Sequence, residues 1–254
     1  MARPFLALGG IALIGIGLAT AFGWGWGSSY DTTTPLANAI HGVRLNGDSG
    51  SVKIRVGSDA SIHQHLRWHW RGKPGDAFHM EGDQLVLDDC GNNCSASFEL
   101  TLPAAVPVVG HVDSGGLDIA GMSSVDVQTD SGAAKIENVA GPVKLRHDSG
   151  SIELHDVGDV ELRSDSGSIH ADGVRGSVDV TSSSGSVRFE LARENDVKVH
   201  ADSGSVEVTV PGGPYRVLGN TDSGHRQIDV QTSDSAAHAL DLTTDSGSVT
   251  VHAA

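Results

Sequence analysis

Three closely spaced histidines are the first residues in the chain with the chemistry to bind a metal ion. His63, His65 and His69 lie in a segment of alternating apolar and polar residues. If this segment is a β-strand, all three imidazoles point to one side, and neutral imidazoles two residues apart can share a metal. The competing interpretation is structural: the alternate residues, including Trp68 and Trp70, form the buried face and cover the first repeat unit. We favour the structural interpretation and keep the histidines as candidates for metal ligation.

The two cysteines, Cys90 and Cys94, enclose the turn residues Gly-Asn-Asn. Disulfides persist in exported proteins, and the features described below indicate export. We therefore predict a small loop closed by a Cys90–Cys94 disulfide, which removes both thiolates from any metal site with the histidines.

The tripeptide Asp-Ser-Gly recurs and has two chemical interpretations. Asp accepts hydrogen bonds from backbone N–H groups two residues on, and Gly supplies the positive φ that closes a corner. Alternatively, stacked carboxylates form a calcium ladder, although the spacing differs from the nonapeptide calcium repeat and Ser183 replaces one Asp. We interpret the triplets as structural turns and expect no cofactor, with calcium as the alternative. An early triplet begins at Asp48, and the predicted turn residues are Asp113, Asp130, Asp148, Asp165, Asp202, Asp222, Asp245, Gly115, Gly132, Gly150, Gly167, Gly185, Gly204, Gly224 and Gly247.

The period of the triplets predicts the architecture. From Asp113 the spacings are 17, 18, 17, 18, 19, 20 and 23 residues, counting Ser183-Ser-Gly as a unit. An apolar-x-apolar pair stands on each side of every triplet, as in short strands with one face inward. An antiparallel meander would not require the same residue types to recur in step. The recurrence therefore favours an all-β, parallel β-solenoid with ~17–20-residue coils, right-handed by the preference of parallel crossovers, with Val143 over Val125 and Ile152 over Ala134.

The charge balance excludes some partners. The chain has 254 residues with 17 Lys+Arg against 32 Asp+Glu, a formal net charge of -15. Polyphosphates and anionic lipid headgroups repel such a chain, so we expect no nucleic-acid partner. Most acidic residues are Asp rather than Glu, and together with 33 Gly this indicates many turns and few helices.

An apolar segment near the N-terminus predicts export. Arg3 precedes a stretch without charges at 5–22, and Trp24 and Trp26 follow it. The stretch is close to the ~20 residues that span a bilayer, and the tryptophans suit the interface, so we expect one transmembrane anchor. The small-x-small sequence at 19–21 leaves open a cleaved signal peptide and a secreted protein. In both cases the rest of the chain lies outside the cytoplasm.

Four regions follow from these features. Residues 1–27 form the transmembrane anchor or signal segment, and the small and polar residues 28–37 form a linker. Residues 38–112 form an irregular N-terminal β region that contains the Cys90–Cys94 loop. Residues 113–254 form the Asp-Ser-Gly repeat solenoid.

The order of motifs resembles a bacterial putative-adhesin family. The resemblance rests on the Asp-Ser-Gly-Ser-[Val/Ile] units, the early cysteine pair, Leu-Thr-Leu-Pro at 100–103 and Val-Pro-Gly-Gly-Pro-Tyr at 210–215. It covers residues 38–254. The resemblance implies a surface-exposed β-solenoid on a single N-terminal membrane segment, in a family without an established ligand or catalytic residues.

The C-terminal end of the predicted solenoid has an unprotected edge. Val249 and Val251 form the last strand in the sequence, and the chain stops at Ala254. An open edge invites pairing. We expect that the excursion at 224–239 folds over this edge or that the edge mediates self-association.

Two classes of function remain. The first is a non-catalytic adhesin or binding module for an envelope polymer or a surface ligand. The second is a structural or regulatory scaffold of the cell envelope that acts through a membrane protein. A polysaccharide-active β-helix enzyme is a remote alternative, for which Asp156 and Asp159 are an example of paired carboxylates. Acidic residues are spread over every unit, however, so we predict that the protein is not an enzyme.

Overall fold

The computed structural model describes residues 27–37, 39–69 and 72–254. These residues form β-strands and no helix, which confirms the all-β prediction. Over the same ranges, no helix has the length and apolar character needed to cross a membrane, and the membrane span predicted at 5–22 lies outside the described residues.

The described strands join into one sheet. Their bounds are β1 (Ser28–Pro35), β2 (Gly42–Ser49), β3 (Val52–Val56), β4 (Ser61–Trp68), β5 (Phe78–Glu81), β6 (Gln84–Asp88), β7 (Cys94–Leu102), β8 (Pro107–Ser114), β9 (Leu117–Ala120), β10 (Ser124–Glu137), β11 (Val143–His155), β12 (Val160–Val174), β13 (Val178–Leu191), β14 (Val197–Val210), β15 (Tyr215–Leu218), β16 (Thr221–Asp229) and β17 (His238–Ala253).

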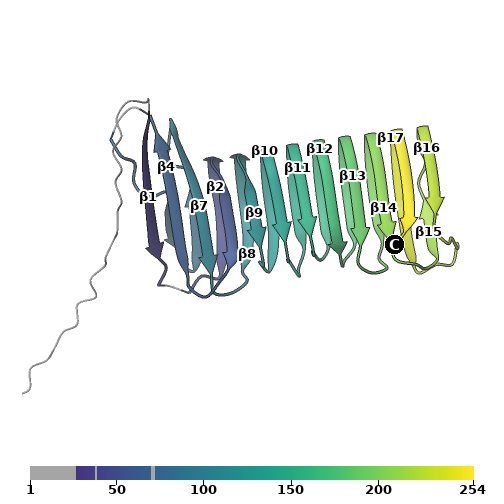
Figure 1. Cartoon of the computed structure of the whole chain (residues 1–254), viewed down its shortest axis with the longest axis horizontal. Helices are drawn as coiled ribbons and strands as arrows, with labels where there is room; N and C mark the ends of the chain where they lie inside the picture. The colour runs from purple at the N-terminus through teal and green to yellow at the C-terminus, as the bar shows by residue number, and fades with distance from the viewer. Residues whose placement is uncertain (1–26, 38, 70–71) are drawn as a thin grey trace, which may run out of the picture.

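The repeat units stack in parallel and in register. Strands β10 to β14 each pair in parallel with the next, and each long strand runs through its triplet, so that one strand carries both halves of a unit. Val143 pairs with Val125 and Ile152 with Ala134, as predicted. Figure 1 shows the strands side by side along the long axis of the molecule. This stacking is consistent with a solenoid.

Three sets of apolar side chains point inward and fill the space enclosed by each unit. The first set lies two and four positions after each triplet's Gly, and the second lies three and five positions before its Asp. Along each strand these buried residues alternate with exposed residues. A third set follows a corner in which Asn138 and Asp156 have φ of 55° and 52°, a conformation that Asn and Asp tolerate. The third set consists of the buried side chains Met122, Val139, Val157 and Val174.

The prediction of an irregular region at 38–112 is wrong. Strands β2 and β3 flank the Asp48 triplet and pair in parallel with β8 and β9, so they form a regular unit. On their other side they pair in parallel with β6 and β7, a second unit. The stack therefore begins before residue 113. The first unit in the sequence lies second in space, an order that no local pattern encodes.

The prediction of a linker at 28–37 is also wrong. Strand β1 pairs antiparallel with β4 over its full length, and β4 pairs antiparallel with β7. Tyr30 and the consecutive threonines at 32–34 favour this extended pairing. The two antiparallel strands cap the parallel stack at its N-terminal end (Figure 1). On β4, Ile62 and Leu66 are buried as expected and Trp68 is half-buried against the core, while Trp70 lies outside the described residues.

The C-terminal units are out of sequence order as well. Strand β17 pairs in parallel with β14, and β15 and β16 pair with the far side of β17. Val249 and Val251 therefore lie inside the stack, which corrects the expected edge. Part of the predicted excursion, β16, forms the last unit in space instead. This unit suits the end because it is irregular, with Arg226 in register with the buried Val249.

Candidate binding groove

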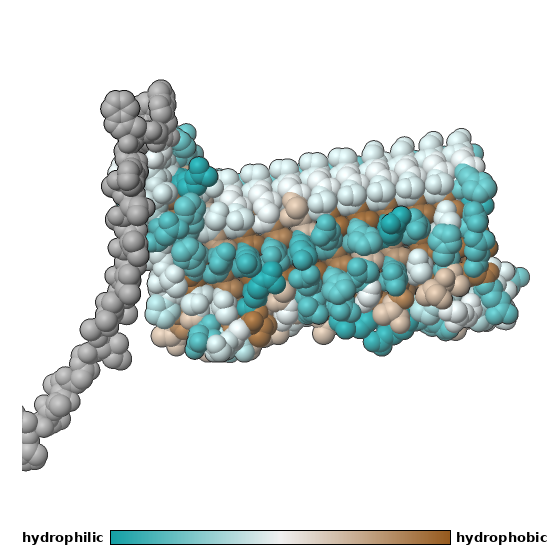
Figure 2. All heavy atoms as spheres, viewed as in Figure 1, coloured by the Kyte–Doolittle hydropathy of each residue, from teal (hydrophilic) through white to brown (hydrophobic). Residues whose placement is uncertain are grey.

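A groove runs lengthwise along the face formed by the second halves of the units. One wall, the small-residue row, consists of the residues directly after the corner glycines, mostly serines. The other wall, the charged row, lies two residues further along each strand, and buried apolar side chains form the floor between the walls. Figure 2 shows matching pale, brown and teal bands along the molecule. From β7 to β14 the charged row is Glu99, Lys53, Asp118, Lys135, Glu153, His170, Arg188 and Glu207.

The first of two widenings of this lengthwise groove lies at its N-terminal end. Its volume is about 560 Å³. The floor comes from Phe98, Val52 and Leu117, which are almost fully buried, so the surface there is flat and carries no projecting aromatic ring. Side chains of the charged row and of β1 and β4 line its sides.

His63 and His65 of the cap strand β4 line this first widening. Asp31 of β1 accepts a hydrogen bond from His65 Nδ1 at 2.6 Å, and its Oδ1 lies 3.6 Å from His63 Nε2. His63 Nδ1 also lies 2.9 Å from the Thr33 hydroxyl. His69 is exposed further along the chain, and among the described residues no group of three or more His, Cys, Asp or Glu is arranged to hold a metal. The three predicted ligands therefore do not form a metal site, because the acidic residue of β1 engages two of them.

The charged row alternates in sign across most of its length. Neighbouring units place Glu99 beside Lys53, Asp118 beside Lys135 and Lys135 beside Glu153. At one strand spacing, about 4.8 Å, opposite charges attract and like charges would repel. The alternation therefore supports the observed register and leaves the wall close to neutral.

Ion pairs hold several of these side chains in place. Arg55 Nη2 lies 2.6 Å from Asp118, and Lys135 Nζ lies 2.9 Å from Glu137. The hydrogen bond and charge of Lys135 lower the pKa of Glu137, and Glu137 raises the pKa of Lys135 in return. Lys53 and Glu99 have no ion pair in the described part of the chain, so these two are available to a ligand.

A second widening of about 260 Å³ lies further along the groove. Ser168, Ser186 and Ser205 form one side of it, and Arg188 and Glu207 the other. Arg188 donates two hydrogen bonds to one oxygen of Glu207, at 2.6 and 3.2 Å. As in the first widening, small residues lie opposite charged residues. Here the small residues are serines, and the charged residues form an ion pair.

The triplets stabilise the stack in a different way from the one predicted. Their glycines have positive φ, as expected, for example 131° at Gly167. A Cβ there would overlap the Gly150 carbonyl oxygen of the adjacent unit, so Gly also permits close backbone approach. The predicted Asp caps are absent from the triplets of the described chain, which contain no bond from a backbone N–H to their own Asp. Instead a Ser hydroxyl donates to the Asp carbonyl oxygen of the neighbouring unit, as from Ser166 to Asp148 at 3.2 Å.

The calcium alternative has no site in the described residues. One concavity of about 450 Å³ on the opposite face brings together Asp113, Asp126 and Asp130. His111 and Arg146 share it, and the three carboxylates are not arranged to hold a metal. Repulsion between the carboxylates is reduced by the guanidinium of Arg146 and by exposure to water.

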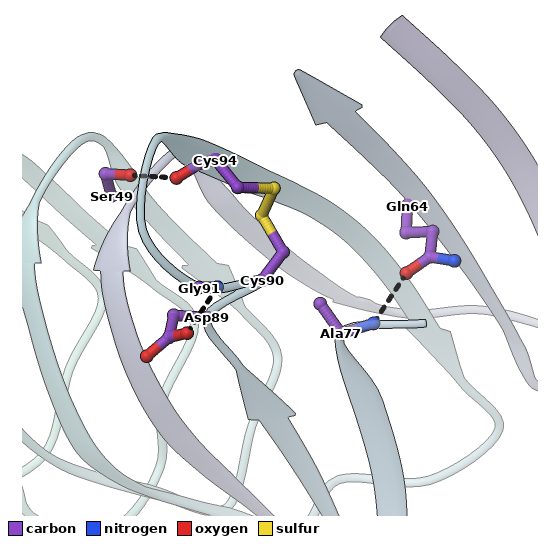
Figure 3. The surroundings of a disulfide bond; sticks show 7 residues. All are labelled: Ser49, Gln64, Ala77, Asp89, Cys90, Gly91 and Cys94. Carbon is purple, nitrogen blue, oxygen red and sulfur yellow. Dashed lines mark hydrogen bonds between the residues drawn. A yellow bond between two sulfur atoms is a disulfide. The ribbon is translucent and has the colours of Figure 1, made fainter. Parts of the chain in front are cut away.

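Cys90 and Cys94 form a disulfide with a Cα–Cα distance of 5.5 Å. Figure 3 shows the loop beside β7, where Asp89 accepts a hydrogen bond from the Gly91 N–H at 2.7 Å. Ser49, from the neighbouring unit, donates to the Cys94 carbonyl oxygen at 3.4 Å. The loop therefore replaces the triplet as the corner of the β6–β7 unit.

The carboxylates considered for catalysis have structural partners. Asp159 accepts hydrogen bonds from the backbone N–H and the hydroxyl of Ser177, at 2.8 and 3.0 Å. Asp156 occupies the positive-φ corner and lies 3.3 Å from His155. Neither residue lines a described groove or concavity.

A buried polar column inside the triplet corner was not predicted. The residue before each triplet points inward, which buries Thr129, His147, Ser164 and Ser182 in register. His147 is 2% exposed, and neither ring nitrogen has a hydrogen-bond partner in the described structure. Burial lowers the pKa of His147. The sequence signal for this column is the polar residue, Thr, His or Ser, that directly precedes the triplet in these four units.

The fold and the groove of the described residues define a class: an all-β protein of parallel, stacked repeats with an elongated surface groove. The sequence matches the family model Toastrack DUF4097 over residues 95–252, and the chain belongs to this family. This match confirms the predicted family resemblance.

The solved structures that match the chain share little of its sequence. A putative lipid binding protein from Parabacteroides distasonis is 13% identical, with a TM-score of 0.47 over 89% of this chain and 97% of that one. A putative adhesin from Bacteroides fragilis is 12% identical, with a TM-score of 0.42 over 88% and 97%. A putative adhesin from Parabacteroides distasonis is 12% identical, with a TM-score of 0.36 over 88% and 97%. No curated protein matches the sequence.

Proposed function

We propose that the protein is a non-catalytic binding rod of the cell surface, a β-solenoid that takes an elongated, hydroxyl-rich polymer along its lengthwise groove. The observation that carries this proposal is the repetition of the groove's walls and floor from unit to unit. A repeated surface suits a ligand that is itself repetitive, because each added ligand unit finds the same contacts.

The chemistry of the walls favours an uncharged polymer such as a neutral glycan. Serine hydroxyls donate and accept hydrogen bonds, and carboxylates accept them from ligand hydroxyls. The alternating charged row is close to neutral and so attracts an ionic chain only weakly, and the net charge of -15 repels polyanions. Lys53 and Glu99, which lack ion-pair partners among the described residues, supply a donor and an acceptor at the first widening of the groove.

The location belongs to the same proposal. The apolar segment at 5–22 anchors the chain in the membrane, and the stacked units lie outside the cytoplasm. The cap formed by β1 and β4 then lies nearest the membrane, and the groove extends away from it. Cleavage after 19–21 would instead release the rod into the medium.

Retention of the purified full chain, in mild detergent, on insoluble envelope polymers tests the proposal. We expect saturable retention on an uncharged polymer that changes little with calcium, chelator or raised salt, because the contacts are hydrogen bonds between neutral or locally balanced groups. Absence of retention on every polymer would contradict the proposal and favour the alternative, a scaffold that acts through a membrane protein partner.

A further inference from the structure

The outer edge of β16 is the free strand edge at the C-terminal end of the stack. Strand β16 pairs with β17 on one side, and no other strand of the described residues pairs with its opposite side. The neighbouring β15 is covered at its first residue, because Tyr215 exchanges backbone hydrogen bonds with Gln231 and Ser233. Strand β16, Thr221–Asp229, is therefore the longer of the two strands with open backbone groups at the end of the stack opposite β1 (Figure 1).

Arg226 and Ile228 cover the apolar core beneath this edge. Arg226 is in register with the buried Val249, so it occupies an inward position. Its guanidinium donates to the carbonyl oxygens of Leu242 and Leu218, at 2.9 and 2.8 Å. An inward-pointing charge on an edge strand discourages non-specific sheet extension. Only a partner that accommodates Arg226 can pair with this edge.

We propose that this partner is a second copy of the chain, which pairs with β16 antiparallel about a two-fold axis at Gln227. Outward-facing residues of β16 alternate with inward-facing ones, as the exposed His225, Gln227 and Asp229 show. A two-fold axis at Gln227 places His225 of each copy opposite Asp229 of the other. Both pairs combine a basic with an acidic side chain, so the strand complements itself.

The alternative registers are less favourable. A two-fold axis at Arg226 would bring the two guanidinium groups face to face at the centre of the edge. Registers shifted by one residue would set inward side chains against outward ones and expose Ile228. With the axis at Gln227, Arg226 instead lies opposite Ile228 of the second copy, where its aliphatic stem packs. His225 has no hydrogen-bond or ion-pair partner within the described part of one chain, so it is free to make the new contact.

This inference is independent of polymer binding, because the edge lies outside both widenings of the groove. The two copies would meet at the ends that are distal to the N-terminal segment. Since a two-fold contact closes on itself, the product is a dimer and not a filament.

Cysteine cross-linking of the full chain in mild detergent tests the geometry. Gln227 lies on the proposed axis, where directly opposite Cβ atoms are about 4.5–5.5 Å apart, close to the separation that a disulfide spans. We expect Q227C to form a disulfide-linked dimer under mild oxidation. The control T250C, which lies beside Gln227 on the same face but one strand inside the stack, should stay monomeric. Equal cross-linking of the two variants, or none for Q227C, would overturn the proposal.

Charge complementation provides a second readout. H225D alone places two carboxylates opposite each other, and D229K alone places a lysine opposite His225, so each should weaken dimerisation by about tenfold. In a mixture, the introduced lysine of one chain faces the introduced aspartate of the other, and His225 of the first faces Asp229 of the second. We expect differently tagged H225D and D229K chains to co-purify with each other more than either does with itself. Self-association that is unchanged in both variants would contradict the two-fold pairing.

Discussion

Gly167 lies so close to Gly150 of the adjacent unit that a Cβ on Gly167 would overlap the Gly150 carbonyl oxygen. The same contact recurs at every triplet corner, through Gly115, Gly132, Gly185, Gly204, Gly247 and Gly224. Because a carbonyl in the sheet cannot move without loss of ladder hydrogen bonds, the corner glycines fix how closely the units stack.

Gly167→Ala should therefore destabilise the protein by about 2–4 kcal/mol, from backbone strain at positive φ and from steric overlap. Urea unfolding followed by circular dichroism measures this. Gly47→Ala is the matched control, since its Cβ meets open space and Gly47 has no positive φ; it should change stability by less than about 0.5 kcal/mol. Equal effects for the two substitutions would contradict the steric role of the corner.

The buried imidazole of His147 predicts a dependence of stability on pH. Burial lowers its pKa in the folded state, so the unfolded chain binds the proton more readily. Well above about pH 6.5, the pKa of His in the unfolded chain, His147 is neutral in both states and does not make the free energy of unfolding depend on pH. As the pH falls below this value towards the folded pKa, the unfolded chain takes up the proton first and the folded state loses stability.

Comparison of urea unfolding at pH 7.5 and 5.5 checks this expectation. His147→Thr, which copies its in-register neighbour Thr129, should lose less stability on acidification than the wild type. The exposed His170→Thr serves as the control and should retain the wild-type difference. A wild-type difference that survives His147→Thr would show that other groups cause the acid sensitivity.

Arg226→Ala should loosen the C-terminal end of the stack while the rest remains intact. The substitution leaves the carbonyl oxygens of Leu218 and Leu242 without their donors and uncovers the core. Hydrogen exchange should accelerate in β15 to β17 and stay unchanged in β10 to β12. Arg216→Ala is the control, because Arg216 is exposed and makes no ion pair in the described chain. Uniform acceleration along the stack would contradict a local cap.

The period of the sequence was sufficient to predict the stacked units and their register, and insufficient to predict their order. Val125 over Val143 follows from the recurrence of like residues at equal positions. The placement of β17 between β14 and β16 depends on which units fit each other in three dimensions. The inward Arg226 suits only a terminal unit, so in retrospect it marks the end of the stack.

The groove was only partly visible in the sequence. Aligning the units would have revealed the alternation of Glu99, Lys53, Asp118 and Lys135, because each occupies the same position after its corner. The pairing of β1 with β4, which brings Asp31 to His63 and His65, could not be predicted from a short polar segment. Polar strands acquire their structure from their partners rather than from a hydrophobic pattern of their own.

A paired comparison of two tyrosine substitutions tests the binding groove most directly. Ala133 lines the first widening of the groove, so Ala133→Tyr should fill it and reduce polymer retention by at least about tenfold, the equivalent of about 1.4 kcal/mol. Thr181 is exposed in the first half of β13, outside both widenings of the groove, and Thr181→Tyr should retain the polymer like the wild type. Equal retention of all three proteins would place the binding surface elsewhere, and loss only in Thr181→Tyr would assign it to the opposite face.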